Sequence, residues 1–310
     1  MDGTEYDIVV MGTGITESIL SGLLSMEGNK ILNIDKNPYY GDSAASLNLT
    51  RLWETFKKGQ EPPKELGHNR DWNIDLTPKF VMAYGKLVKM MIKTEVSKYL
   101  NWKPVDGSYV YQWSDGGLFS SEGGKIKKVP GNDTEAIKSS LMSMFEKRRC
   151  HKFYQFIQKL DEKDPKTYEK YNLQDMTFKD LTQKFGLEEK TLDFLGHAVA
   201  LYTDNSYTDR PALEVLTKAK LYIDSAGRFA DSPFIYPVYG LSGIPESFSR
   251  KSAVYGGVYM LNVQLKSLEK ENDRHKITGV WEETEGHCFA KKIICHPSYL
   301  KLLGLGDRLK

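Results

Sequence analysis

The stretch Tyr6-Asp-Ile-Val-Val-Met-Gly-Thr-Gly-Ile-Thr-Glu17 is the clearest indication of the fold in this sequence. Its first half is a short apolar run rich in β-branched residues, which predicts a buried parallel strand that stops at Gly12-Thr13-Gly14. Apolar residues then recur at helical spacing, and Gly28-Asn29 predicts the end of that helix. A second strand is predicted at residues 30–35. A strand, a glycine turn, a helix and a strand within ~30 residues are typical of a dinucleotide-binding fold.

The glycine turn departs from the pattern that binds a dinucleotide. Gly12 and Gly14 allow a backbone to approach a pyrophosphate, but the third glycine position is Glu17. A carboxylate in the first turn interacts favourably with the helix dipole and would repel a phosphate. Asp35, about 20 residues further on, is where a ribose hydroxyl would be held. We therefore predict a dinucleotide-type fold that binds no cofactor, although Glu17 could also be a helix-start residue with no further role.

Charge and composition exclude several classes of protein. Lys and Arg number 43 and Asp and Glu 41 among the 310 residues, so the net charge is +2, with no block of like charge. This argues against binding nucleic acid by bulk phosphate neutralisation. No apolar run approaches the ~18 to 20 residues of a membrane span, and Asp2, Glu5 and Asp7 stand where a signal peptide would be positive. Three scattered cysteines fit reduced thiols, so we expect a cytosolic protein.

Elements along the chain predict two domains. Strands are predicted at residues 109–113, 125–129, 256–261, 277–281 and 290–295, and helices at residues 78–99, 134–160, 179–185 and 188–202 and after Pro211. Because the middle of the chain carries helical periodicity with almost no glycine, a helical insert is expected within a discontinuous α/β domain. The predicted boundaries are 1–130 and 229–310 for domain I and 131–228 for domain II.

Signals for catalysis or a metal are weak. The six histidines show no ligand spacing, and neither a nucleophile elbow nor a phosphate loop is found. The pairs His287-Cys288 and Cys295-His296 suggest a metal. Positions seven apart on a strand point to opposite faces and lie ~23 Å from each other, so the pairs cannot converge. We predict neither a metal site nor an enzyme.

Five stretches carry a resemblance to one family. They are Glu5-Tyr-Asp-Ile-Val-Val-Met-Gly-Thr-Gly-Ile-Thr-Glu17, Asp35-Lys-Asn-Pro-Tyr-Tyr-Gly41, Asn69-Arg-Asp-Trp-Asn-Ile-Asp-Leu76, Tyr236-Pro-Val-Tyr-Gly240 and Tyr255-Gly-Gly-Val-Tyr-Met-Leu-Asn262. With them the chain resembles the Rab GDP dissociation inhibitors, which are relatives of the Rab escort proteins. No long insertion separates the first two stretches, which favours the inhibitors. Family members continue past the point that matches Leu300, so the family's C-terminal part is expected to be missing.

The resemblance implies a fold and a function. The fold would be α/β, an FAD/dinucleotide-binding-like (monooxygenase-like) domain without FAD, with an inserted all-helical domain. The function would be to bind prenylated, GDP-loaded Rab GTPases, slow GDP release, extract the GTPases from membranes and carry them through the cytosol as a monomer. Domain I would hold the GTPase and domain II the geranylgeranyl groups, with transient membrane contact. The alternatives are an FAD-dependent oxidoreductase, an accessory of prenyl transfer like the escort proteins, and a helical adaptor without a lipid role.

The resemblance also implies residues that contact the GTPase. Tyr40, Arg250 and Met260 match the family's Rab-binding platform, Arg228, Ser232 and Phe234 match a mobile loop that touches the GTPase, and Arg70 is a further platform candidate. Four of these residues have a structural alternative. Tyr40 could pack beneath its loop, Arg250 could be an ordinary solvated residue, Met260 could belong to the core, and Arg70 could simply pair with Asp71.

Two positions differ from the family. Gly243 stands where members usually carry a glutamate, with Glu246 as a shifted substitute, and Phe234 replaces a typical tyrosine.

The lipid site is defined only broadly. The helical insert has enough apolar residues to form a lipid pocket, and methionines make such a pocket adaptable. The candidates are Leu141, Met144, Phe145 and Leu195.

Overall fold

The computed structural model describes residues 2–114, 123–130, 143–302 and 304. The chain forms two compact units, one of residues 1–79, 90–102 and 236–310 and one of residues 80–89 and 103–235. Residues 80–89, 103–130 and 229–235 therefore belong to the second unit, where the sequence predicted the first. The reason is packing, because Val129 is buried in the helical core and Val110 packs against it.

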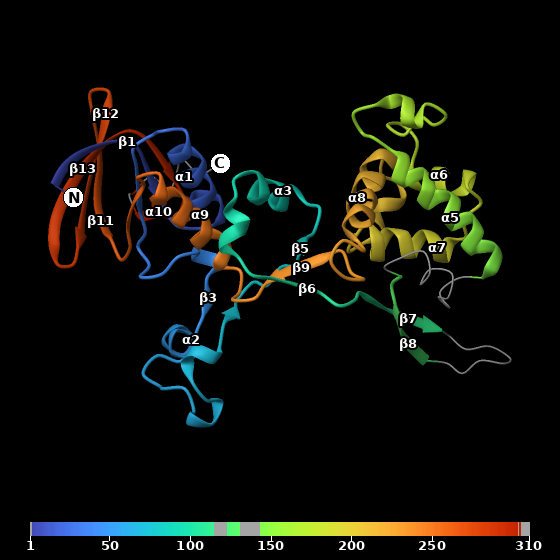
Figure 1. Ribbon diagram of the computed structural model, residues 1–310, viewed down its shortest axis with the longest axis horizontal. Coiled ribbons are helices and arrows are strands. Elements are labelled where there is room, and N and C mark those ends of the chain that lie inside the picture. Colours follow the sequence, from blue (N-terminus) through green and yellow to red (C-terminus); the bar gives the residue numbers. More distant parts are fainter. Residues whose placement is uncertain (1, 115–122, 131–142, 303, 305–310) are drawn as a thin grey trace. The chain divides into compact units, whose positions relative to one another are not determined.

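A six-stranded sheet with the order β10-β2-β1-β13-β12-β11 organises the first unit (Figure 1). The strands are β1 (Asp2–Met11), β2 (Ile31–Ile34), β10 (Val258–Met260), β11 (Gln264–Glu271), β12 (Arg274–Trp281) and β13 (Thr284–Cys295). β10, β2, β1 and β13 pair in parallel, whereas β12 pairs antiparallel with β13 and β11. The predicted strands at the start of the chain and in its last third are confirmed.

Helices cover both faces of this sheet. They are α1 (Ile15–Met26), α9 (Gly243–Val254) and α10 (Pro297–Leu302), and α2 (Leu49–Phe56) lies in the same unit. Side chains of β1 alternate between the faces: Ile8 and Val10 pack with Leu24 of α1, and Val9 and Met11 share a cluster with Tyr299 of α10. Helices α1 and α9 run side by side.

The second unit is helical. Its elements are α5 (Met144–Lys159), α6 (Phe178–Lys184), α7 (Glu189–Phe194), a π-helix (Leu195–Val199) and α8 (Ala212–Ser225), with a hairpin of β7 (Tyr109–Ser114) and β8 (Gly123–Lys128). The hairpin strands and the helices near residues 179–185 and after Pro211 agree with the sequence predictions. Helix α5 begins after Ser143, whose side chain accepts the Glu146 N–H, and residues 134–142 of the predicted helix lie outside the described residues.

Short elements complete the chain. They are β3 (Ser46–Leu47), β4 (Ile74–Asp75), β5 (Val81–Met82), α3 (Lys86–Lys93), β6 (Trp102–Pro104), β9 (Phe234–Pro237), and the 3-10 turns Asp42–Ala44, Lys64–Leu66, Asn69–Asp71, Val96–Tyr99, Pro165–Tyr168 and Asn205–Thr208. β3 pairs with β4, and a further sheet has the order β5-β9-β6.

The single helix predicted over residues 78–99 is wrong. Helix α3 has only eight residues, because Gly85 turns back on Met82, with its N–H 2.9 Å from the carbonyl, before the helix starts. Glu95 then adopts a left-handed conformation at φ 61° and stops helical propagation. The helical spacing of the apolar residues did not predict these two interruptions.

Candidate functional site

The glycine turn after β1 is covered by the side chain of Glu17. A Cβ placed on Gly14 would lie 2.6 Å from Glu17 Oε2, and one on Gly12 would lie 3.3 Å from Glu17 Cγ. Glu17 is only 7% exposed, so its carboxylate lies against the backbone that a pyrophosphate would approach. The turn therefore does not fit a dinucleotide phosphate, for both steric and electrostatic reasons.

Asp35 fastens a loop instead of presenting a free carboxylate. Its Oδ2 accepts hydrogen bonds from the Thr13 N–H (2.7 Å) and the Thr13 hydroxyl (2.6 Å), and its Oδ1 accepts one from the Asn37 N–H (2.8 Å). The residue is 1% exposed. Asp35 is the position at which this fold would hold a ribose hydroxyl, and a ribose would have to displace these donors to bind there.

The same network positions the loop that carries Tyr39 and Tyr40. Gly41, at φ 104°, donates its N–H to the Thr13 carbonyl at 3.0 Å, which anchors the loop on the glycine turn. The Arg51 guanidinium lies 5.0 Å from the ring centre of Tyr39, and the rings of Tyr40 and Tyr259 are 6.0 Å apart. Residues that would bind a nucleotide in this fold therefore hold a loop in place.

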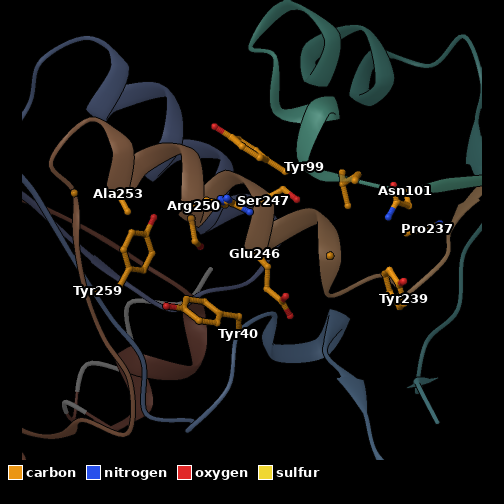
Figure 2. Close-up of a pocket in the computed structure, with 15 residues that line it drawn as sticks. Tyr40, Tyr99, Asn101, Pro237, Tyr239, Glu246, Ser247, Arg250, Ala253 and Tyr259 are labelled. Carbon is orange, nitrogen blue, oxygen red and sulfur yellow. The ribbon is translucent and has the colours of Figure 1, made fainter. Parts of the chain in front are cut away.

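A cavity of about 490 Å³ lies beside helix α9 in the first unit (Figure 2). Its lining residues come from the Tyr40 loop, the segment after α3, the segment after β9, α9 and β10; they are Tyr40, Tyr99, Leu100, Asn101, Pro237, Tyr239, Gly240, Gly243, Glu246, Ser247, Ser249, Arg250, Ala253, Gly257 and Tyr259. The structure thus brings together Tyr40 and Arg250, which the resemblance placed on one surface from segments about two hundred residues apart.

Charged and aromatic groups shape this cavity. The Arg250 guanidinium lies 4.8 Å from the ring centre of Tyr99. Desolvation raises the pKa of the Tyr40 hydroxyl, with smaller contributions from Tyr259 and Glu246. Desolvation also raises the pKa of the Glu246 carboxyl, against a hydrogen bond with Ser242 that lowers it. The cavity therefore offers one guanidinium and one carboxylate between tyrosine rings.

Met260 follows Tyr259, a residue that lines the cavity, but its own side chain faces away from the cavity. Its side chain is 9% exposed and packs in the sheet core with Val9 and Met11. Because side chains alternate along a strand, Tyr259 points to the opposite face and lines the cavity. The sequence analysis did not select Tyr259, although the alternation around the apolar Met260 could have indicated it.

The other predicted contact residues are dispersed. Arg70 is exposed, with its Nε 3.8 Å from Asp71. In the second unit, Arg228 is exposed above the ring of Tyr84, at 4.1 Å, and Phe234 is half-buried against Phe80. Ser232 is buried, and its hydroxyl donates to the Val105 carbonyl at 2.7 Å. Its side chain supports the backbone and is not available to a partner.

The candidate lipid residues are not brought together. Met144 and Phe145, in the first turn of α5, are 85% and 80% exposed, whereas Leu195 is buried in the helical core. Leu141 lies outside the described residues. Among the described residues, no three His, Cys, Asp or Glu side chains gather as a metal site would need, and no helix has the length and apolarity to cross a membrane.

Comparisons with known proteins agree with this arrangement. A profile of the GDP dissociation inhibitor family matches residues 1–306. Guanosine nucleotide diphosphate dissociation inhibitor 1 of Arabidopsis thaliana is 49% identical over 298 residues, which are 96% of this chain and 64% of that protein. A crystal structure of Rab GDI from Plasmodium falciparum superposes with a TM-score of 0.82 at 45% identity, covering 97% of this chain and 67% of that one.

More distant structures share only the fold. A putrescine oxidase with a redesigned cofactor site superposes with a TM-score of 0.54 at 11% identity, covering 97% of this chain and 60% of that one. The predicted fold class, a dinucleotide-binding-like α/β fold with a helical insert, is thereby confirmed. The chain belongs to the GDP dissociation inhibitor family. It spans about 64% of the length of the curated relatives it matches.

Proposed function

We propose that this chain binds prenylated, GDP-loaded Rab GTPases, slows their GDP release, extracts them from membranes and carries them through the cytosol. It would act as a monomeric binding protein in vesicle-mediated transport, without catalysis and without a cofactor. The names of the curated relatives and of the Plasmodium protein support this function. The observation that carries it is the cavity beside α9, whose lining includes both Tyr40 and Arg250.

The first unit would hold the GTPase. Tyr40 and Arg250 line the cavity from two segments, and Arg70 is exposed in the same unit, so these three would make direct contacts. Met260 would act from the core by holding β10, and Arg228 and Phe234 would add contacts from the second unit with Ser232 as their support. A preference for GDP would arise because switch loops without a γ-phosphate can adapt to a preformed surface.

The second unit would shelter the geranylgeranyl groups. A prenyl chain contributes ~0.8 kcal/mol per buried CH₂, so a soluble carrier must offer comparable apolar burial together with a protein contact. Met144 and Phe145 are exposed apolar side chains at the start of α5, and Leu195 lies in the core of the same unit. Transient contact with the membrane during extraction follows from this role.

The test is extraction of prenylated Rab from liposomes, with GDP-loaded and GTP-loaded forms side by side. We expect the GDP form to be extracted and the GTP form to remain. Tyr40→Ala or Arg250→Ala should weaken binding by ~1 to 3 kcal/mol with a nearly unchanged thermal midpoint, whereas Tyr255→Ala, an exposed tyrosine outside the cavity lining, should have little effect. Equal extraction of both forms, or of neither, would contradict the proposal.

A flavin oxidoreductase is the competing function, because the distant structures share its fold. Glu17 against Gly14 and the occupied carboxylate of Asp35 oppose it. We expect the purified protein to be colourless. Stoichiometric flavin absorbance would favour the oxidoreductase instead.

A further inference from the structure

Glu246 occupies a distinctive position in the cavity. It lies in the first turn of α9, and its side chain extends from the helix into the space between Tyr40 and Tyr239 (Figure 2). The side chain is accessible to solvent, yet the surrounding protein atoms desolvate the carboxyl enough to raise its pKa. A carboxylate placed in this way gains free energy when a cation enters, because the cation offsets the lost hydration.

The nearby cations of the chain are engaged elsewhere. Arg250, one turn further along α9, lies over the ring of Tyr99. Lys251 is nearly buried, with its Nζ 3.9 Å from Glu95 Oε2 and 5.5 Å from the ring centre of Tyr255. Among the described residues, no Lys, Arg or His nitrogen lies within 4.0 Å of the Glu246 carboxylate. The charge of Glu246 is therefore available to a group from outside the chain.

The walls of the cavity also suit a cation. Tyr40 and Tyr239 contribute aromatic rings on either side of Glu246, and aromatic rings attract ammonium and guanidinium groups within about 6 Å of their centres. Gly240 and Gly243 leave the neighbouring wall without side chains. A side chain at position 243 would have to move Leu100, whose Cδ2 lies 3.0 Å from a Cβ built there. Among the residues that line the cavity, Glu246 is the one with an acidic side chain.

We propose that Glu246 binds a lysine or arginine side chain of the protein partner, which enters the cavity between Tyr40 and Tyr239. The identity of that partner as a Rab GTPase rests on the proposed function. The site itself rests on the cavity, the aromatic walls and the carboxylate without a cation. Arg250 lies over the ring of Tyr99 in the same cavity, and its N–H groups would donate to an acceptor on the partner, so the two charges together would orient the partner on α9.

The first experiment measures affinity for GDP-loaded prenylated Rab as a function of salt. Glu246→Gln keeps the shape but removes the charge, and we expect it to weaken binding about 5- to 50-fold at low ionic strength and to reduce the salt dependence. Glu246→Lys should weaken binding further. Glu27→Gln, an exposed glutamate just after α1 and outside the cavity, is the matched control and should bind like the unchanged protein.

A second experiment does not depend on Rab. Nα-acetyl-arginine amide is titrated into the protein while the Glu246 carboxyl is followed by carbon-13 NMR. We expect saturable binding and a lower pKa of Glu246, both absent in Glu246→Gln, where binding should be lost.

The outcomes distinguish a failure of the cation site from a failure of the proposed function. If Tyr40→Ala weakens Rab binding and Glu246→Gln does not, the proposed function stands and the cation site is wrong. If the unchanged protein binds no Rab, the proposed function is wrong, and the titration alone decides the site. Equal binding of the arginine probe to the unchanged protein and to Glu246→Gln overturns it.

Discussion

Different kinds of side chain form the contact between α1 and α9 in the first unit and the helical core of the second unit. Small and polar residues meet between α1 and α9. The hydroxyls of Ser25 and Ser252 are 2.7 Å apart, Ser249 donates to Ser18 at 3.4 Å, and a Cβ on Gly22 would lie 3.1 Å from the ring of Phe248. Such a contact allows close approach and fixes the register of the helices through directional hydrogen bonds.

Large rings fill the second unit. Phe153 is fully buried, and its ring centre lies 4.9 Å from Phe185, 6.2 Å from Phe178 and 6.4 Å from Phe156. Apolar contact of this kind is strong but has little directional preference. The difference suggests a division of roles: the polar contact sets the position of α9 and hence of its cavity, and the aromatic core supplies stability to the helical unit.

The largest effect should come from breaking the aromatic core. Phe153→Ala removes a fully buried ring and should lower the free energy of unfolding by ~3 to 5 kcal/mol. Urea denaturation measures this loss in the free energy of unfolding. Hydrogen exchange then locates the loss in the second unit. The control is Phe145→Ala on the same helix, which is 80% exposed and should change stability by less than ~0.5 kcal/mol. Similar losses in the two variants would refute the assigned role of the core.

An intermediate effect should come from Glu146, a buried carboxylate of the second unit. Glu146 accepts hydrogen bonds from the Glu188 N–H (2.8 Å) and from Arg149 (2.5 and 2.9 Å). Burial raises its pKa, but the bonds from Thr191, Glu188 and Arg149 outweigh burial and leave the pKa below 4.5. Glu146→Gln should cost ~1 to 3 kcal/mol at neutral pH.

The stability that Glu146 contributes should decrease at acidic pH. Because the folded pKa is depressed, the contribution of Glu146 is complete above its unfolded value of about 4.5 and is lost as the pH falls through the folded pKa. The unchanged protein should therefore lose stability in the second unit over that range, and the Gln variant should lose less. Urea denaturation at pH 7 and below pH 4.5 measures the difference; parallel pH profiles would contradict it.

The smallest effect should come from the polar contact. Ser25→Ala or Ser252→Ala removes one hydrogen bond and should each cost ~0.5 to 1.5 kcal/mol, while the double variant should cost less than the sum, because neither hydroxyl is then left unpaired. Hydrogen exchange in α9 should nevertheless rise in both single variants. Strict additivity, or unchanged exchange in α9, would show that the serines do not fix this helix.

The βαβ start, the helical insert and a glycine turn unsuited to a phosphate could all be predicted from the residues alone. These depend on local pattern: β-branched runs, helical spacing and a glutamate at the third glycine position, each of which acts within a few residues. The family resemblance added Tyr40 and Arg250, and the structure placed both on one cavity.

The folded chain was needed to show which side chains face that cavity and which unit each segment joins. Met260 turned out buried and Tyr259 exposed to the cavity, because strand β10 pairs with β2 in a register that sends Met260 into the sheet core. Asp35 became a loop anchor because Thr13 and Asn37 donate to it, and Val129 joined the helical unit by burial. These outcomes depend on contacts between residues far apart in the chain, which residue type and local spacing do not encode.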